Sequence, residues 1–203
     1  MPAATPTSKD LARTDTIEGR ILDAALVQFE RVGVKKTTIE DVARQAEVDR
    51  VTVYRRIGSR DDLVRAVTAR EVQRLLADLE DIPSRHDTID AVVATIFVTV
   101  ITRWRTHPLI DRMLTLEPDR LLPQLTTEGS SFFTMSVVAS TTILRNTLQE
   151  LDLPDIPDIG ARIEIACRVV HSLILQPVST IDLESEHALD AFAREYIVPI
   201  VTR

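Results

Sequence analysis

Residues 46–63 read AEVDRVTVYRRIGSRDDL, and the eight residues from Arg50 to Ile57 include three arginines, a threonine and a tyrosine. A helix of this length is barely two turns long and is only marginally stable in water on its own. Neighbouring segments must therefore hold it, which leaves its polar side chains free to meet something outside the protein. This concentration of positive charge is unexpected, because the whole chain has a net charge of −7.

Helical patterns lie on both sides of this stretch. Thr16–Val32 has apolar residues at three- and four-residue steps, as an amphipathic helix does, and Gly33 suits its carboxyl end. Thr38 and Ser59 are each followed three residues later by an aspartate, which is the spacing of a capping box at the start of a helix. We therefore expect further helices over 38–46, 49–57 and 59–82.

Two short helices joined by a tight turn, the second with outward polar side chains, form a helix-turn-helix. The second helix of such a motif fits the major groove of DNA, where arginine binds guanine edges or phosphates and hydroxyl groups bind phosphate oxygens. The residues expected to face outward are Arg50, Thr52, Tyr54 and Arg55, with Val51 placed to touch a thymine methyl group. The alternative is that these arginines form an ordinary solvated helix face.

The rest of the chain has the pattern of longer, more apolar helices separated by prolines. Val92–Thr102 has the Val, Ile and Thr content of a strand, but its length and its helical neighbours favour a buried helix. Glycine is scarce, at 5 of 203 residues, and no hairpin pattern is present, so an all-α fold is expected. The expected helices are Thr88–Thr106, Leu125–Leu151, Ile159–Gln176 and Glu184–Val198.

Composition and charge favour a cytoplasmic protein with a basic head. The single cysteine, Cys167, rules out an internal disulfide and fits a reducing compartment. Residues 1–15 lack a hydrophobic signal core, and the longest apolar stretch, Ala91–Ile101, is too short to cross a bilayer. Residues 1–60 hold 11 Lys and Arg against 9 Asp and Glu, whereas the remainder holds 13 against 22. Such a head can meet a polyanion although the whole protein is acidic.

The stretch from Ile17 to Leu63 resembles the amino-terminal domain of the TetR family of bacterial transcriptional regulators. The resemblance rests on ILDAALVQFERVGVKKTTIEDVARQAEV at residues 21–48 and on TVYRRIGSRDDL at residues 52–63. It implies an all-α protein with an amino-terminal three-helix helix-turn-helix domain followed by a larger helical ligand-binding and dimerisation domain. The expected division is a disordered leader at 1–15, the DNA-binding domain at 16–60 and the effector-binding and dimerisation domain at 61–203.

The same resemblance implies roles for individual residues. Thr38 corresponds to a helix cap that also touches phosphate, and Arg60 stands where the family usually has a phosphate-binding lysine. In a homodimer, two recognition helices about 34–36 Å apart would read a palindromic operator. The DNA-binding residues that we expect are Thr38, Arg50, Val51, Thr52, Tyr54, Arg55 and Arg60.

Three positions depart from the family's usual pattern. Glu47 occupies the turn position usually given to glycine, and a left-handed backbone there would cost a non-glycine residue about 1 kcal/mol. Ile57 replaces the usual phenylalanine, and Val51 is bulkier than the small residue often found at its position. Glu47 is also the one feature that favours a protein that has lost operator binding.

The resemblance further implies that the last two long helices build a four-helix bundle with a second subunit. Their apolar stripes need partners, and the alternative is that they pack within one chain. The residues of these stripes are Ile163, Ala166, Val170, Leu173, Ile174, Leu189, Phe192, Tyr196 and Ile200.

Bulky or soft side chains of the central helices are candidates for an effector pocket, with ordinary core packing as the alternative. Cys167 and His171 share a helix face, but two ligands are too few for a structural zinc site, so no metal or cofactor is expected. No glycine-rich phosphate loop, nucleophile elbow or paired-histidine zinc motif is present, so no enzyme activity is expected. The pocket candidates are Phe97, Trp104, His107, Met113, Phe132, Phe133 and Met135.

Together these features predict a sequence-specific DNA-binding transcriptional regulator, a repressor released by a small-molecule effector. Its expected partners are double-stranded DNA with a palindromic operator, a second copy of the chain, and an effector of unknown identity. The alternative function is that of a helical ligand-binding or scaffold protein without operator binding. A salt-dependent affinity for DNA would distinguish the two.

Overall fold

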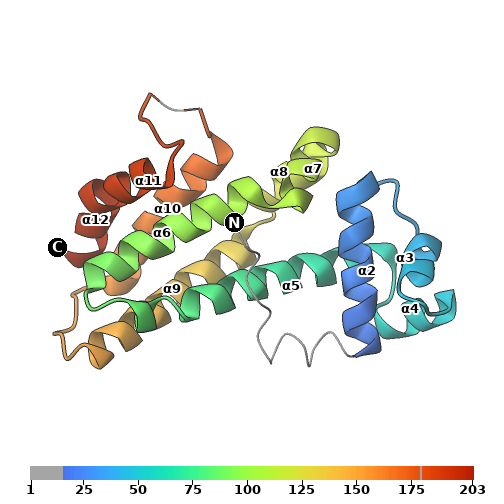
Figure 1. Ribbon diagram of the computed structural model, residues 1–203, viewed down its shortest axis with the longest axis horizontal. Coiled ribbons are helices and arrows are strands. Elements are labelled where there is room, and N and C mark those ends of the chain that lie inside the picture. The colour runs from blue at the N-terminus through green and yellow to red at the C-terminus, as the bar shows by residue number, and fades with distance from the viewer. Residues whose placement is uncertain (1–15, 179) are drawn as a thin grey trace. The chain divides into compact units, whose positions relative to one another are not determined.

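The computed structural model describes residues 16–178 and 180–203, and every regular element in these two ranges is a helix (Figure 1). The all-α expectation is confirmed, and Val92–Thr102 lies inside helix α6 (Ile89–Thr106). The leader expected at residues 1–15 lies outside the described residues. No helix in the described ranges is both long and apolar enough to cross a membrane.

The described chain divides into two compact units. The first runs to Val72 and also includes Pro108–Pro118, and the second contains Gln73–His107 and Asp119–Arg203. Helix α5 (Arg60–Glu80) carries the chain from the first unit into the second. The functional boundary expected between residues 60 and 61 stays a prediction, because these units are defined by packing alone.

The first unit has its own hydrophobic core. Helix α2 begins at Thr16, whose hydroxyl accepts a hydrogen bond from the Gly19 N–H at 2.9 Å, and it ends where the Gly33 N–H donates to the Phe29 carbonyl. The helices of this unit, apart from the start of α5, are α2 (Ile17–Val32), α3 (Ile39–Gln45), α4 (Arg50–Arg56) and α7 (Pro108–Leu116). Its almost fully buried side chains include Ile21, Ala25, Phe29, Val34, Val42, Val53, Leu63 and Val67.

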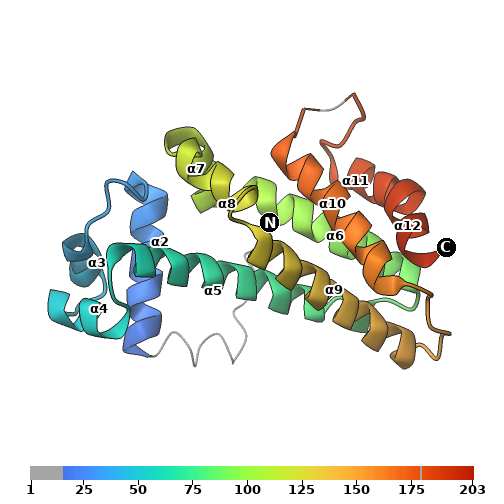
Figure 2. The ribbon, with the colours of Figure 1, turned by 180° about the vertical axis from the view of Figure 1, so that it is seen from behind.

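The second unit is a helical bundle in which α9 and α10 run side by side (Figure 2). Its buried core draws on α6, α9, α10 and the carboxyl-terminal helices, through Val92, Phe97, Leu144, Ile163 and Leu189. Besides α6 and the end of α5 it contains η1 (Pro83–Arg85), all but the first residue of α8 (Pro118–Leu125), α9 (Ser130–Glu150), α10 (Ile159–Leu175), α11 (Glu186–Phe192), η2 (Ala193–Ile197) and α12 (Val198–Thr202).

Prolines expected only to separate helices instead begin two of them. Pro108 and Pro118 are the first residues of α7 and α8. Proline suits this position because its φ is already helical and its missing N–H would have no intrahelical partner there. Leu125 is the last residue of α8, so the helix expected over Leu125–Leu151 starts only at Ser130, after the loop that follows α8.

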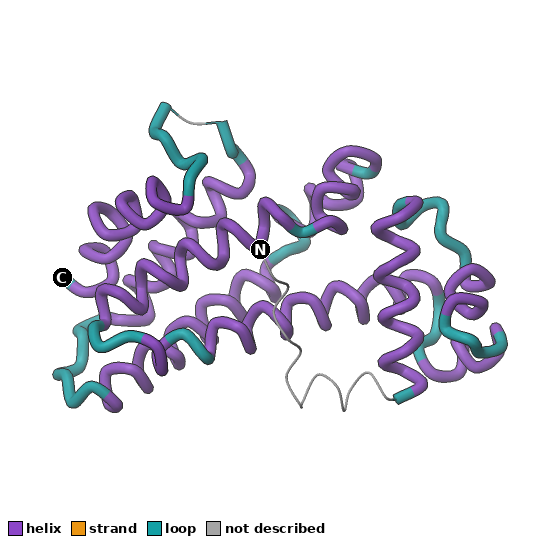
Figure 3. Tube along the Cα trace, in the orientation of Figure 1, coloured by secondary structure: helices purple, strands orange, loops and turns teal. Residues whose placement is uncertain are grey.

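The carboxyl-terminal helix extends beyond its expected end at Val198. α11, η2 and α12 follow one another without a loop, as the helix colouring of Figure 3 also shows, and they reach Thr202. The π-helical turn η2 lies just before Pro199. Because proline lacks an N–H and its ring clashes with the carbonyl four residues earlier, a wider turn at this point relieves the clash.

Candidate nucleic-acid interface

The capping box predicted at Thr38 is present and begins α3. The Thr38 hydroxyl accepts from the Asp41 N–H at 3.1 Å, and the Asp41 carboxylate accepts from the Thr38 N–H at 3.2 Å and from its hydroxyl at 2.6 Å. These hydrogen bonds from Thr38 hold the pKa of Asp41 below its ordinary value. Thr38 itself remains exposed and accessible to an outside ligand.

Asp49 caps α4, as the sequence predicts. Its carboxylate accepts from the Thr52 N–H at 2.6 Å and from the Thr52 hydroxyl at 3.1 Å, and these bonds lower the pKa of Asp49. Thr52 is half-buried, and its hydroxyl group donates its one hydrogen to the Asp49 carboxylate. Only its oxygen lone pairs and methyl group remain for another partner.

Glu47 adopts a left-handed backbone conformation, with φ 55°, which is the case in which the sequence analysis expects a cost for a non-glycine residue. The turn is a Schellman motif, in which the Val48 N–H donates to the Ala43 carbonyl at 3.0 Å and the Glu47 N–H donates to the Arg44 carbonyl at 3.3 Å. The left-handed conformation costs glutamate about 1 kcal/mol relative to glycine. Glu47 is also exposed, so a negative charge stands at the corner of the helix-turn-helix.

The outward face of α4 matches the expectation except at Thr52, which is half-buried. Val53 is fully buried and holds the helix onto its support, whereas Arg50, Val51, Tyr54 and Arg55 are exposed. Val51 is 72% exposed, which is unusual for an apolar side chain and suits a contact with another molecule. The Arg50 guanidinium lies over the Tyr54 ring, 5.8 Å from its centroid, so the two side chains restrain one another.

A surface hollow of about 440 Å³ brings four of the seven predicted DNA-binding residues together. Val51, Thr52 and Arg55 do not line it. The hollow combines cationic side chains with hydroxyl groups, which is the chemistry that binds phosphate oxygens. Its lining residues are Lys35, Thr37, Thr38, Ile39, Glu40, Arg50, Tyr54 and Arg60.

Lys35 and Glu40 line this hollow although neither was predicted as a site residue. Both side chains are exposed. Lys35 precedes α3 in an irregular loop, where no helical periodicity shows which way a side chain faces. Its position next to Lys36, before a capped helix, is the only signal in the sequence that pointed to it.

Arg60 serves the loop before α3 as well as the hollow. Its Nε donates to the Thr37 carbonyl at 3.1 Å, and a terminal nitrogen of the same guanidinium donates to the Val34 carbonyl. A lysine at this position would offer a charge but not this forked pair of donors. Arg60 therefore shapes the wall of the hollow.

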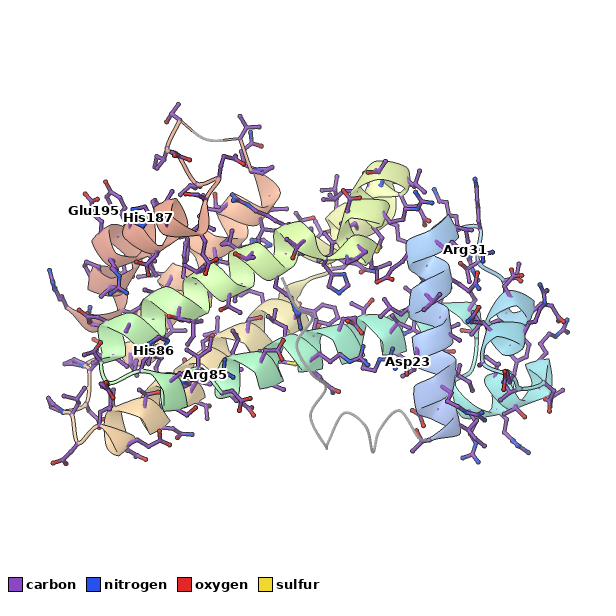
Figure 4. All side chains as sticks on the ribbon, in the orientation of Figure 1. Asp23, Arg31, Arg85, His86, His187 and Glu195 are labelled. Atoms are coloured by element: carbon purple, nitrogen blue, oxygen red, sulfur yellow. The ribbon has the colours of Figure 1, made fainter. Side chains whose placement is uncertain are left out.

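A buried arginine fixes α2 to α5 beneath the helix-turn-helix. Arg70 pairs with Asp23 at 2.9 Å and donates to the Gly19 carbonyl at 3.2 Å. Asp23 is labelled midway along α2 in Figure 4. Because Arg70 is buried whereas Asp23 is partly exposed, removing Asp23 would leave the buried guanidinium with less compensation for its charge, so this contact favours the observed packing of α2 on α5.

The seven pocket candidates do not gather in one place. Met113 belongs to the first unit, where it is buried on α7. Phe97 is buried in the core of the second unit, with its ring centroid 5.6 Å from that of Phe192, as the core alternative expected. The remaining five are half-buried side chains of the second unit: Trp104, His107, Phe132, Phe133 and Met135.

Cys167 and His171 have separate surroundings. Burial, reinforced by the charge of Glu164, raises the pKa of the Cys167 thiol to about 11. His171 Nε2 lies 2.6 Å from the Leu125 carbonyl, and its ring stacks edge-on against Phe133. Within residues 16–178 and 180–203, no three His, Cys, Asp or Glu side chains cluster in a way that could hold a metal ion.

Comparison with known proteins points in one direction. Residues 21–67 match the family model described as bacterial regulatory proteins, tetR family. Among curated proteins, none matches the chain.

Solved structures share the fold of almost the whole chain. The TetR-family repressor AlkX from Dietzia sp., implicated in biodegradation of n-alkanes, is 22% identical with a TM-score of 0.66, covering 92% of this chain and 96% of AlkX. The TetR-family repressor QsdR from R. erythropolis is 21% identical with a TM-score of 0.60, covering 94% and 97%. A transcriptional regulator from Cytophaga hutchinsonii is 15% identical with a TM-score of 0.67, covering 90% and 97%.

Proposed function

This chain is a TetR-family transcriptional regulator, and we propose that it binds a palindromic DNA operator as a homodimer and represses transcription until a small-molecule effector releases it. TetR-family regulators are in general DNA-binding repressors without enzyme activity.

The observation that carries the proposal is the hollow beside α4. Arg50 and Tyr54 come from α4, Arg60 comes from α5 and Thr38 is the residue that caps α3, yet all four line one surface depression. A backbone phosphate placed there would meet arginine and lysine donors together with hydroxyl groups. An ordinary solvated helix face would not require such convergence.

Base recognition falls to the exposed residues of α4 that lie outside the hollow. Arg55 can bind a guanine edge with two donors, and the highly exposed Val51 can touch a thymine methyl group. With phosphate bound in the hollow, the first turns of α4 would lie along the major groove. This division of labour is the usual one, in which phosphate contacts position the protein and base contacts specify the sequence.

Dimerisation is proposed to use the exposed apolar side chains of the carboxyl-terminal helices. Ile163, Ala166 and Leu189 are buried in the chain's own core, as the one-chain alternative expected. Ile165 on α10 is 52% exposed and Tyr196 in η2 is 49% exposed. These two side chains are the ones on the carboxyl-terminal helices that a partner subunit would cover in the proposed dimer.

The effector is proposed to bind among the half-buried side chains of the second unit. Trp104, Phe132, Phe133 and Met135 offer aromatic and soft apolar surface, which suits an apolar small molecule. Arg168 lies over the Phe133 ring, 4.9 Å from its centroid, and adds a cation at the same place. Because Trp104 is the only tryptophan, its fluorescence reports directly on candidate ligands, and a screen without any spectral change would contradict this site.

The deciding experiment is selection of binding sites from a random DNA pool at near-physiological salt. The test variant replaces Arg50, Tyr54 and Arg55 by alanine. The control variant replaces Arg85 and Arg145, which are exposed arginines of the second unit, by alanine. It therefore removes as many positive charges as the test variant does. We expect the wild type and the control to enrich a palindromic consensus and the test variant to enrich none.

One observation favours the alternative of a helical ligand-binding protein without an operator. Glu47 stores backbone strain and puts a negative charge at the turn where DNA would approach. If the folded, dimeric wild type enriches no sequence with or without ligands, this alternative replaces the repressor function.

A further inference from the structure

We propose that Arg112 on α7 and Glu117 just after α7 are positioning residues for DNA binding. They hold the backbone segment Arg31–Lys35, whose last residue lines the hollow. The inference rests on the proposed function and extends it to residues that touch no DNA. It concerns contacts within the first unit, to which Pro108–Pro118 belongs.

Glu117 holds the loop by its main chain. Its Oε1 accepts a hydrogen bond from the Lys35 N–H at 2.7 Å, although the two residues lie 82 positions apart. Glu117 is only 2% exposed, and among the described residues no group donates to its Oε2. A carboxylate with so little solvent depends strongly on the donor that it has, so this hydrogen bond is costly to break.

The loop is built for this approach of the carboxylate. Gly33 has φ 89°, in the region that favours glycine, and a Cβ at this position would lie 2.9 Å from Glu117 Oε1 and 3.3 Å from Leu116 Cδ1. Any larger residue would push the carboxylate away from the Lys35 amide. Gly33 therefore ends α2 and admits Glu117 at the same time.

Arg112 makes a second link from α7 to the same segment. Its guanidinium donates to the carbonyl of Arg31, which Figure 4 labels at the end of α2. The apolar side chains of Leu109 and Met113 are buried and hold α7 in place. The two polar links thus rise from a helix that is itself fixed by packing.

The opposite side of the loop is held by residues at the hollow. The Thr37 hydroxyl donates to the Gly33 carbonyl at 2.8 Å, and Arg60 donates to the Thr37 carbonyl. A loop without regular secondary structure needs such partners for its backbone polar groups. Without the Glu117 bond, the Lys35 backbone is held less firmly beside the hollow that its side chain lines.

The test compares Glu117→Ala with Glu117→Gln in the full chain. Glutamine keeps an acceptor oxygen for the Lys35 N–H, whereas alanine removes it, and both lose the negative charge. Asp111→Ala, an exposed residue on the same helix, is the matched control for the charge. Affinity is measured over a range of salt concentrations on a random-sequence duplex and on the selected consensus duplex, with circular dichroism and thermal melting to confirm folding.

We expect Glu117→Ala to bind the consensus duplex about tenfold more weakly, because a displaced Lys35 would lose one charge-assisted hydrogen bond to a DNA phosphate. The logarithmic salt slope should fall by about 0.9, the value for one phosphate contact. Glu117→Gln should stay within about threefold of the wild type, and Asp111→Ala should bind at least as well, because losing a negative charge favours DNA. Amide hydrogen exchange at Lys35 should quicken in Glu117→Ala alone.

Unchanged affinity and salt slope in folded Glu117→Ala would overturn the inference and leave the proposed function intact. Equal weakening in Glu117→Gln would also overturn it, because that variant keeps an acceptor for the Lys35 N–H and should still hold the loop. Failure of the wild type to bind either duplex would overturn the proposed function, and this inference with it. If Glu117→Ala does not fold, Arg112→Met makes the same test at the Arg31 carbonyl, with weakened binding supporting the inference and unchanged binding overturning it.

Discussion

Arg60 Nε donates to the Thr37 carbonyl across 3.1 Å, so the first residue of α5 holds the loop that precedes α3. The two residues are 23 positions apart and both line the hollow. The guanidinium thus has two tasks, to shape the loop and to present positive charge. Substitutions can separate these tasks.

We expect Arg60→Lys to lower the free energy of unfolding by about 1 kcal/mol, because an ammonium group cannot reproduce the forked donors to Thr37 and Val34. DNA affinity should fall less in Arg60→Lys than in Arg60→Ala, since lysine keeps the charge. Urea unfolding and DNA titration check this, with exposed Arg56→Lys as the control. Equal stability of Arg60→Lys and wild type would contradict the structural task.

We expect Glu47→Gly to raise the free energy of unfolding by about 1 kcal/mol, because glycine adopts φ 55° without strain. Glu47→Ala removes the charge but keeps the strain. Both variants should bind DNA more tightly at low salt, whereas only the glycine variant should melt at a higher temperature. A stabilised alanine variant would show that charge, not backbone strain, is the cost at this turn.

We expect Tyr54→Ala and Arg55→Ala each to weaken operator binding by about 1–3 kcal/mol with the fold intact. Both side chains are exposed on α4, so their truncation leaves no cavity. Arg56→Ala, exposed on the same helix but outside the predicted site, is the matched control and should bind nearly as wild type. Unchanged affinity of the Tyr54 or Arg55 variant, with unchanged circular dichroism, would remove that residue from the site.

Helix capping predicts a loss of stability in acid. The capping carboxylates Asp41, Asp49 and Asp62 have pKa values below 3.8, because each accepts hydrogen bonds from the backbone or hydroxyl of a capping partner. Since the folded state favours their ionised form, their stabilisation is present above the ordinary pKa of 3.8 and is lost as pH falls through the folded values.

The measurement for this acid sensitivity is urea unfolding from about pH 6 down to about pH 3. Asp49→Asn keeps a capping oxygen but does not titrate. Its deficit relative to the wild type should therefore shrink as the pH falls. A constant difference across the range would show that ionised Asp49 contributes nothing to the cap.

We expect Ile165→Asp to convert the proposed dimer to monomers that remain folded, because a charge at a half-exposed position disrupts a partner surface but not the chain's own core. Sedimentation analysis measures the oligomeric state. Val27→Asp, at an apolar residue of α2 with 47% exposure, is the control and should stay dimeric. A dimeric Ile165→Asp variant would exclude this face of α10 from the interface.

Much of the first unit was predictable from the sequence because its determinants are local. The caps at Thr38, Asp49 and Ser59 depend on partners three residues away, and the structure has all three. The amphipathic pattern of α2 and the ending at Gly33 are likewise contained within single helices. Residues of α4 face outward as expected, because helical periodicity alone decides which side Val53 buries.

The sequence by itself therefore determined the helices, their caps and the outward face of α4, since each depends on residues within one or two turns. Only the tertiary structure decided that Lys35 joins the hollow, that Arg60 holds Thr37, and that Glu117 reaches the Lys35 amide 82 residues away. It also decided that Pro108 begins a helix packed in the first unit. The physical reason is that such contacts satisfy buried charges and loop backbone groups through packing between distant segments, which no local pattern encodes.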